Sequence, residues 1–210
     1  MQQQILDMLD LQDAMNSKVN AAWREQGYAW HRAIWIECAE LMEHHGWKWW
    51  KKPSPDRDQV ILELVDIWHF GLSILLLRGA APELIATEVV EGLGKAPAAG
   101  DFLEDVERFT QATLDTRAFS VPLFATLMAG VGLSFDELYA RYVGKNMLNL
   151  FRQAQGYQQG SYRKNWAGRE DNEHLVDILN ELDCASGSFR DDVYRSLERR
   201  YQDAQQTQEG

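Results

Sequence analysis

The chain has few of the residues that mark disulfide-rich or irregular proteins: its 210 residues include 2 cysteines and 5 prolines. Cys38 and Cys184 form no CxxC or Cys/His spacing, which argues against a disulfide framework and favours a reducing cytoplasm. Residues 1–13 lack the basic and apolar regions of a signal peptide. The longest apolar run, 70–77, is too short to cross a bilayer. We therefore expect a cytoplasmic protein with no membrane partner.

Positive charge is also scarce, and it is unevenly placed. The formal net charge is −11, which disfavours unspecific binding to nucleic acid polymers or anionic membranes. Basic residues gather in 141–170, where six Lys or Arg accompany one acid. Separate acidic and basic segments are what a metal-bound polyphosphate would need. A chance cluster on a solvated face explains the charge equally well.

Patterns typical of strands are scarce, and helical periodicity dominates the chain. We predict an all-α fold in a single domain, 1–210, with a frayed tail at 203–210. One stripe of the first helix carries Gln12 and Asn16 on an apolar face, whereas a competing apolar stripe would leave these amides peripheral. The expected helices are 3–19, 30–45, 58–78, 82–91, 101–116, 119–130, 134–155, 172–183 and 188–205.

Two short acidic motifs stand out within apolar helical segments: Glu37 with Glu40, and Glu63 with Asp66. Residues three apart share a helix face, so each helix presents a pair of carboxylates. A proline-containing loop joins the two helices, which favours an antiparallel hairpin with all four acids converging. Close carboxylates repel one another, and Mg²⁺ prefers such oxygen ligands, so we predict a magnesium site. Solvated acids on amphipathic helices are the competing interpretation, which a second copy of the motif makes weaker.

A second candidate group lies in the basic segment. Lys145, Asn149 and Arg152 are spaced i, i+4, i+7 on one helix face and suit phosphate oxygens, and Tyr157 and Lys164 follow in a loop. A solvated basic face is the alternative interpretation.

With these motifs in place, the chain resembles the dimeric, all-α dUTP diphosphatases (dUTPases) of the all-α nucleoside triphosphate pyrophosphatase superfamily. The middle segment, 80–131, carries no matching motif and corresponds to a variable region. Ala167 stands where the family commonly has a polar residue. The segments that carry the resemblance are Glu37–Leu41, Trp47–Lys51, Glu63–Phe70, Tyr142–Gln153 and the positions 156, 157, 160–162, 164, 166, 168 and 170–173.

The resemblance implies Mg²⁺-dependent hydrolysis of dUTP to dUMP and pyrophosphate, by attack of a metal-activated water at the α-phosphorus. This reaction would cleanse the nucleotide pool and supply dUMP, and the family allows dUDP as a second substrate. Glu37, Glu40, Glu63 and Asp66 would hold Mg²⁺, with Glu40 orienting or deprotonating the water. The implied substrate contacts are Gln12 and Asn16 on the uracil, Trp47 and His69 near sugar and base, and Lys145, Asn149, Arg152, Tyr157 and Lys164 at the phosphates.

The resemblance also implies a homodimer, and 8 tryptophans exceed what one small core easily hides. Three alternatives remain. A pyrophosphatase acting on another nucleotide, such as dCTP, would share the metal motifs. A di-iron helical bundle needs Glu-x-x-His pairs, whereas the chain has only Asp66 with His69 and Asp171 with His174. A non-catalytic helical interaction protein could use the tryptophans as contact surface.

Overall fold

The computed structural model describes residues 1–52, 54–184, 186 and 188–209, with side chains described up to residue 205. The chain divides into two compact units, Met1–Tyr139 and Ala140–Gly210. The division falls within helix α7 (Phe135–Ala154). The expectation of a single domain, 1–210, stays a prediction.

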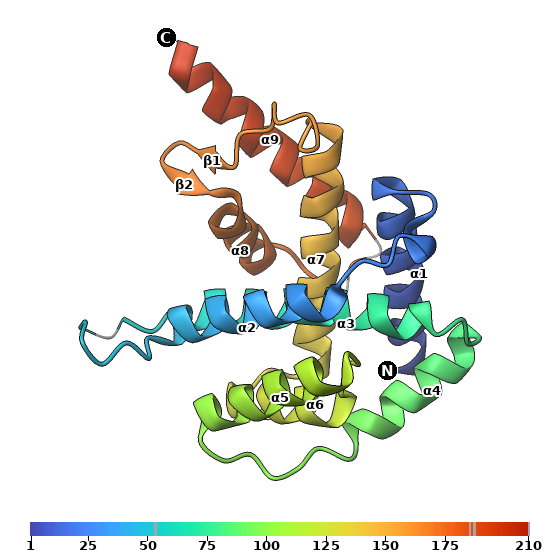
Figure 1. The fold of residues 1–210 in the computed structure, drawn as a ribbon. Helices are drawn as coiled ribbons and strands as arrows, with labels where there is room; N and C mark the ends of the chain where they lie inside the picture. The colour runs from blue at the N-terminus through green and yellow to red at the C-terminus, as the bar shows by residue number, and fades with distance from the viewer. Residues whose placement is uncertain (53, 185, 187, 210) are drawn as a thin grey trace. The chain divides into compact units, whose positions relative to one another are not determined.

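The first unit is built from helices (Figure 1). Their bounds follow the periodicity of the sequence closely, and the middle segment, 80–131, supplies three of them. The helices are α1 (Gln2–Val19), the short 3₁₀ helix η1 (Trp23–Glu25), α2 (Trp30–His45), α3 (Arg57–Leu77), α4 (Pro82–Leu93), α5 (Phe102–Thr116) and α6 (Val121–Gly130).

Helices α2 and α3 pack side by side as an antiparallel hairpin (Figure 1). Helix α2 ends at Gly46, whose φ of 79° is the left-handed conformation that glycine adopts most easily. Helix α3 begins at Asp56, whose carboxylate accepts a hydrogen bond from the backbone N–H of Gln59 at 3.2 Å. A second tie joins the loop to α2, because the Asp56 N–H donates to the carbonyl of His44 at 2.9 Å. These caps fix where the two acidic helices start and stop.

Helix α3 forms the centre of this unit. By length and composition it could cross a membrane, but 78% of its apolar window is buried within the protein. Trp68 on α3 stacks on Phe124 and contacts the edge of Phe119, at ring-centroid distances of 5.1 and 5.7 Å. Gly71 makes room for this cluster, since a Cβ there would lie 2.7 Å from the Phe119 ring. The core therefore sets the rotation of α3, and with it the direction in which its acids point.

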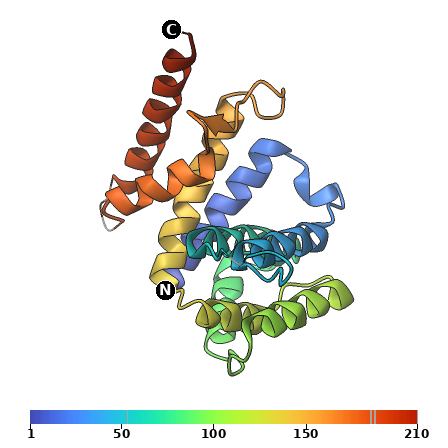
Figure 2. The ribbon, with the colours of Figure 1, turned by 90° about the vertical axis from the view of Figure 1, so that its left-hand side faces the viewer.

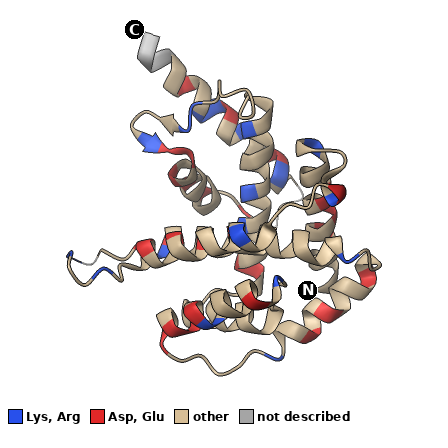
Figure 3. Ribbon diagram, in the orientation of Figure 1, with Lys and Arg blue, Asp and Glu red and all other residues tan. Residues whose placement is uncertain are grey.

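The second unit contains the main part of α7, a small antiparallel hairpin and two further helices (Figure 2). The hairpin pairs β1 (Asn165–Trp166) with β2 (Arg169–Glu170), and α8 (Asp171–Glu181) packs on α9 (Phe189–Glu209). The side chain of Glu170 and that of Glu173 cap the start of α8 reciprocally. Figure 3 shows basic residues in blue along α7 and on β2.

The prediction of an all-α fold is confirmed, with a two-stranded hairpin added that the periodicity did not reveal. In α1 both stripes are buried, and Gln12 and Asn16 lie inside the core, so the interpretation that left them peripheral is wrong. Val19, the last residue of α1, is 43% exposed. Helix α9 runs to Glu209; the frayed tail at 203–210 stays a prediction, and Gly210 lies outside the described residues.

Candidate active site

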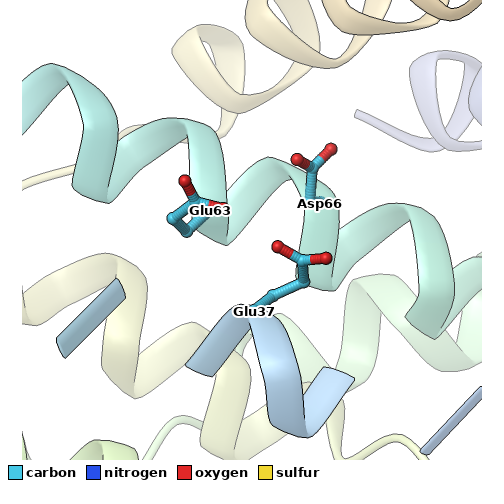
Figure 4. A group of neighbouring side chains, drawn as sticks. All are labelled: Glu37, Glu63 and Asp66. Atoms are coloured by element: carbon cyan, nitrogen blue, oxygen red, sulfur yellow. The ribbon is translucent and has the colours of Figure 1, made fainter. Parts of the chain in front are cut away.

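Three of the four predicted metal-binding carboxylates lie together. Glu37 extends from α2 toward Glu63 and Asp66, which sit one turn apart on α3 (Figure 4). One oxygen of each residue lies within 4.8 Å of the others. Glu63 is only 5% exposed, and the imidazole Nε2 of His44 lies 3.6 Å from its Oε1. The hairpin thus concentrates acidic groups at a partly buried point.

This arrangement fits a hard divalent cation. Carboxylate oxygens are the ligands that Mg²⁺ prefers, and water completes its octahedral shell. Bringing like charges to this separation in a partly buried place is unfavourable unless positive charge offsets it. The oxygen-only ligand set and the spacing therefore meet the demands of a cation such as Mg²⁺.

Glu40 lies one turn beyond Glu37 on α2 and is exposed. Within the described part of the chain, the group of close carboxylates consists of Glu37, Glu63 and Asp66. The role of Glu40 as a ligand or as the residue that activates water stays a prediction.

A second cluster in the first unit joins the predicted uracil-contacting residues to one that the sequence did not indicate, Ser73. Gln12 Nε2 donates to Asn16 Oδ1 at 3.0 Å and to Ser73 Oγ at 3.1 Å. Asn16 Nδ2 donates to Ser73 Oγ at 2.9 Å. His69 Nδ1 donates to Gln12 Oε1 at 2.7 Å, because an amide oxygen can only accept. All four residues are buried. Ser73 could have been found from its place one turn after His69, on the same helix face.

The tryptophan loop after α2 is largely on the surface. Trp47 and Trp49 both contact Trp50 edge-on, at ring-centroid distances of 5.2 and 5.4 Å. Trp49 is 83% exposed. This cluster stabilises the loop locally and leaves aromatic surface open to solvent. A contact of Trp47 with a nucleotide stays a prediction.

In the second unit, Arg152 is held by a partner that sequence reasoning did not single out. Arg152 Nε and Nη2 each donate to a carboxylate oxygen of Asp171 at 2.8 Å, in a bidentate pair. Tyr162 adds a hydrogen bond to Asp171 at 2.7 Å, and Arg152 Nη1 donates to Asn149 Oδ1 at 3.1 Å. The side chains of Arg152 and Asp171 are 13% and 0% exposed.

The pKa of Asp171 reflects this setting. Burial acts to raise it, but the hydrogen bonds and charge of Arg152, with the Tyr162 hydroxyl, hold the pKa of Asp171 below its usual value. Burial and the nearby Asp171 charge raise the pKa of Tyr162. Asp171 is therefore ionised and Tyr162 protonated at neutral pH. The Glu-Asp-Asn run at 170–172, which is part of the family resemblance, was the signal that could have indicated this partner.

The remaining predicted phosphate-binding residues lie in the same unit. Lys145 Nζ donates to Asn172 Oδ1 at 3.0 Å, and Lys164 pairs with Glu170 at 3.1 Å. The Arg152 guanidinium lies 6.0 Å from the centre of the Tyr157 ring. The structure thus groups Lys145, Asn149 and Arg152 through one network, whereas Lys164 belongs to a separate surface pair.

Comparison with known families adds an independent finding. A family model described as dUTPase matches residues 4–157. The chain belongs to the dUTPase family. Its enzymatic activity is that of a dUTP diphosphatase. The matched region contains the close carboxylates, the buried amide cluster and α7, and it ends before Lys164 and Asp171. Comparison with curated proteins gives no match.

Proposed function

We propose that this chain hydrolyses dUTP to dUMP and pyrophosphate with Mg²⁺ as its cofactor, and that dUDP is also cleaved. The observation that carries the proposal is the group formed by Glu37, Glu63 and Asp66, whose oxygens lie within 4.8 Å of one another. When bound there, Mg²⁺ would lower the pKa of a water and offset charge on the phosphates. In a cell, this activity would remove dUTP from the nucleotide pool and supply dUMP.

In this proposal the carboxylates divide the work. Glu37, Glu63 and Asp66 hold the cation from both sides of the α2–α3 hairpin. Glu40, which is exposed and one turn from Glu37, is accessible to solvent and can accept a proton from the water that attacks the α-phosphorus.

The buried amides account for the choice of base. Gln12 and Asn16 each offer a donor and an acceptor, the pattern needed to read the uracil edge. His69 and Ser73 fix the orientation of these amides by hydrogen bonds. A cytosine presents an amino donor where uracil presents a carbonyl acceptor, so fixed amides would discriminate against dCTP. Trp47 and His69 would border the sugar and base.

Lys145, Asn149 and Arg152 would bind the leaving pyrophosphate. Lys145, Asn149 and Arg152 form one hydrogen-bonded network on α7, with Asn172 joining Lys145 to Arg152. Such preorganised donors stabilise developing negative charge better than mobile ones do. Tyr157 and Lys164 would border the same phosphates.

The experiment is a product analysis with purified protein. dUTP, dUDP, dCTP and dTTP are incubated with Mg²⁺ or with a chelator, and the products are separated by ion-exchange chromatography. We expect dUMP and pyrophosphate from dUTP, dUMP and phosphate from dUDP, and no turnover with the chelator. Preferred cleavage of dCTP would overturn the base assignment. Turnover unaffected by chelation would overturn the metal assignment.

Cytoplasmic location and a homodimer belong to the same proposal. Trp35 and Ile36 are exposed neighbours on α2, and aromatic residues are enriched in interface cores. Sedimentation at low micromolar concentration tests the dimer. A monomer with full dUTP hydrolysis would contradict it.

A further inference from the structure

A cavity of about 660 Å³ opens at the start of α2, within the first unit. Its walls come from the loop before α2, the end of α3 and the residues that follow α5; they include Tyr28, Trp30, Arg32, Arg78 and Arg117. None of its lining residues belongs to the carboxylate group or to the buried amide cluster. Its volume lies within the range of about 300 to 1,000 Å³ typical of small-molecule sites.

The cavity is basic, although the chain as a whole is acidic. Arg32, Arg78, Arg117 and His31 all line it. Arg78 forms a pair with Glu88 at 2.7 Å, whereas Arg32 and Arg117 form no ion pair within the described residues. His31 lies close to both of these arginines: burial, then the charges of Arg117 and Arg32, lower its pKa. Arg32 and Arg117 thus bring positive charge to the cavity without an ion-paired acid among the described residues, in a protein that has 32 acidic residues.

Two further donor groups lie at this place. Helix α2 begins without a side-chain cap, and the positive end of its dipole faces this region. The N–H groups of Trp30 and Arg32 already donate to the carbonyls of Tyr28 and Ala29, at 3.0 and 2.8 Å, whereas the N–H of His31 has no acceptor within the described residues. The indole Nε1 of Trp30 is buried and has no acceptor within the described residues. A buried donor without an acceptor is unfavourable, and this one belongs to a residue that lines the cavity.

Arg117 adds a backbone observation. It ends α5 in the left-handed conformation, with φ of 54°, where glycine or asparagine is usual. A large charged side chain is therefore kept at a position that its backbone disfavours, and that side chain borders the cavity.

We propose that this cavity binds a nucleotide at a site separate from the one that hydrolyses dUTP. The phosphates would lie against Arg32, Arg117 and the start of α2, since guanidinium groups bind phosphate oxygens in a bidentate manner. The base would lie against the rings of Tyr28 and Trp30, which contact each other edge-on at 5.6 Å. The apolar and aromatic walls favour a nucleotide over a simple anion.

The experiment measures binding of ATP to the full chain by equilibrium dialysis in the presence of a chelator, which keeps cations from the carboxylate group. Arg117→Gly removes a guanidinium and relieves the left-handed strain, so loss of folding is not expected. Arg32→Ser and the double variant complete the series. Arg195→Ala is the matched control, because it removes an exposed arginine of the second unit.

We expect ATP to bind with a Kd of about 1 mM or tighter, and the double variant to weaken binding about tenfold or more. Arg195→Ala should bind as the unaltered protein does, and dUTP turnover should be unchanged in the whole series. Equal ATP binding by the double variant and the unaltered protein would overturn the site. Inorganic pyrophosphate binding as tightly as ATP would overturn the assignment to a nucleotide.

Discussion

The two units handle buried charge in opposite ways. The first unit gathers charge of one sign, since Glu37, Glu63 and Asp66 lie within 4.8 Å of one another. The second unit pairs opposite charges, since Arg152 and Asp171 form a bidentate pair. The first arrangement gains stability when a cation arrives from outside, whereas the second is neutral by itself. A cluster of like charges therefore indicates a ligand-binding role, whereas a cluster of paired charges indicates in the first place a role in stabilising the fold.

The contrast between the two clusters is tested most strongly by making one acid of the first cluster neutral. Glu63→Gln keeps the volume of a nearly buried side chain and removes one ligand charge. We expect kcat to fall by about 10³-fold or more. Thermal unfolding should also lose its dependence on Mg²⁺, because ligand binding stabilises only the state that binds it.

Glu91→Gln is the matched control, because Glu91 is exposed on α4 and forms an exposed pair with Lys95. Its turnover and its response to Mg²⁺ should match those of the unaltered chain. A Glu63→Gln variant that keeps its Mg²⁺-dependent rise in Tm would show that the cation binds elsewhere.

Glu40→Gln tests the exposed member of the acidic motifs. We expect turnover to fall by about 10²-fold or more, since a positioned general base contributes effects of that size. The free energy of unfolding should change by less than about 0.5 kcal/mol, because the side chain is exposed. Steady-state kinetics with chemical denaturation checks both. Near-normal turnover would exclude Glu40 as ligand or base.

Arg152→Ala tests the paired cluster. It leaves the Asp171 carboxylate buried without its main partner. The free energy of unfolding should therefore fall by about 3 to 5 kcal/mol. Activity should fall by about 10²-fold or more if Arg152 also stabilises the leaving group. The double variant Arg152→Ala, Asp171→Ala should regain much of the stability but none of the activity. If the double variant regains both stability and activity, the role of Arg152 is to stabilise the fold and not to assist the reaction.

The pKa of Asp171 gives the paired cluster a pH dependence. A lowered pKa in the folded protein contributes stability above the ordinary value of 3.8, and that contribution is lost as pH falls through the lowered value. The free energy of unfolding in urea should therefore fall between about pH 6 and pH 3 in the unaltered chain. It should fall less over the same range in the Arg152→Ala, Asp171→Ala double variant. Equal slopes in the two proteins would contradict the assignment.

The smallest effect is expected at an arginine without an ion partner. Arg117→Gly removes a charge that pairs with nothing among the described residues and relieves a φ of 54°. We expect the free energy of unfolding to rise by about 0.5 to 1 kcal/mol, the opposite sign to Arg152→Ala. Thermal and urea unfolding of the two variants side by side measures the contrast. Destabilisation by Arg117→Gly would mean that its guanidinium makes a favourable contact.

Sequence reasoning reached the helices because periodicity and capping are local. The capped start of α3 and the left-handed Gly46 depend on residues that are close in sequence, so the hairpin and its acids could be predicted. The depth of Gln12 and Asn16 could not, because both stripes of α1 are apolar enough to be buried. Ser73 accepts hydrogen bonds from both amides within the core, and it lies 57 residues from Asn16 along the chain.

The same limit applies to the second unit. The spacing of Lys145, Asn149 and Arg152 predicted a shared face, but their partners Asp171 and Asn172 come from the start of a later helix. Nothing local to α7 indicates that its arginine is neutralised. The left-handed Arg117 is also beyond pattern reasoning, because arginine carries no signal for that conformation.

The two cysteines differ in a way that experiment can use. Burial raises the pKa of the Cys38 thiol to about 12, so almost none of it is thiolate at neutral pH, whereas Cys184 is exposed after α8. A maleimide dye should therefore attach to the unaltered chain at one place. Fluorescence energy transfer from tryptophan to that dye would then report how the second unit responds when Mg²⁺ or dUTP is added, without any cysteine having to be introduced or removed.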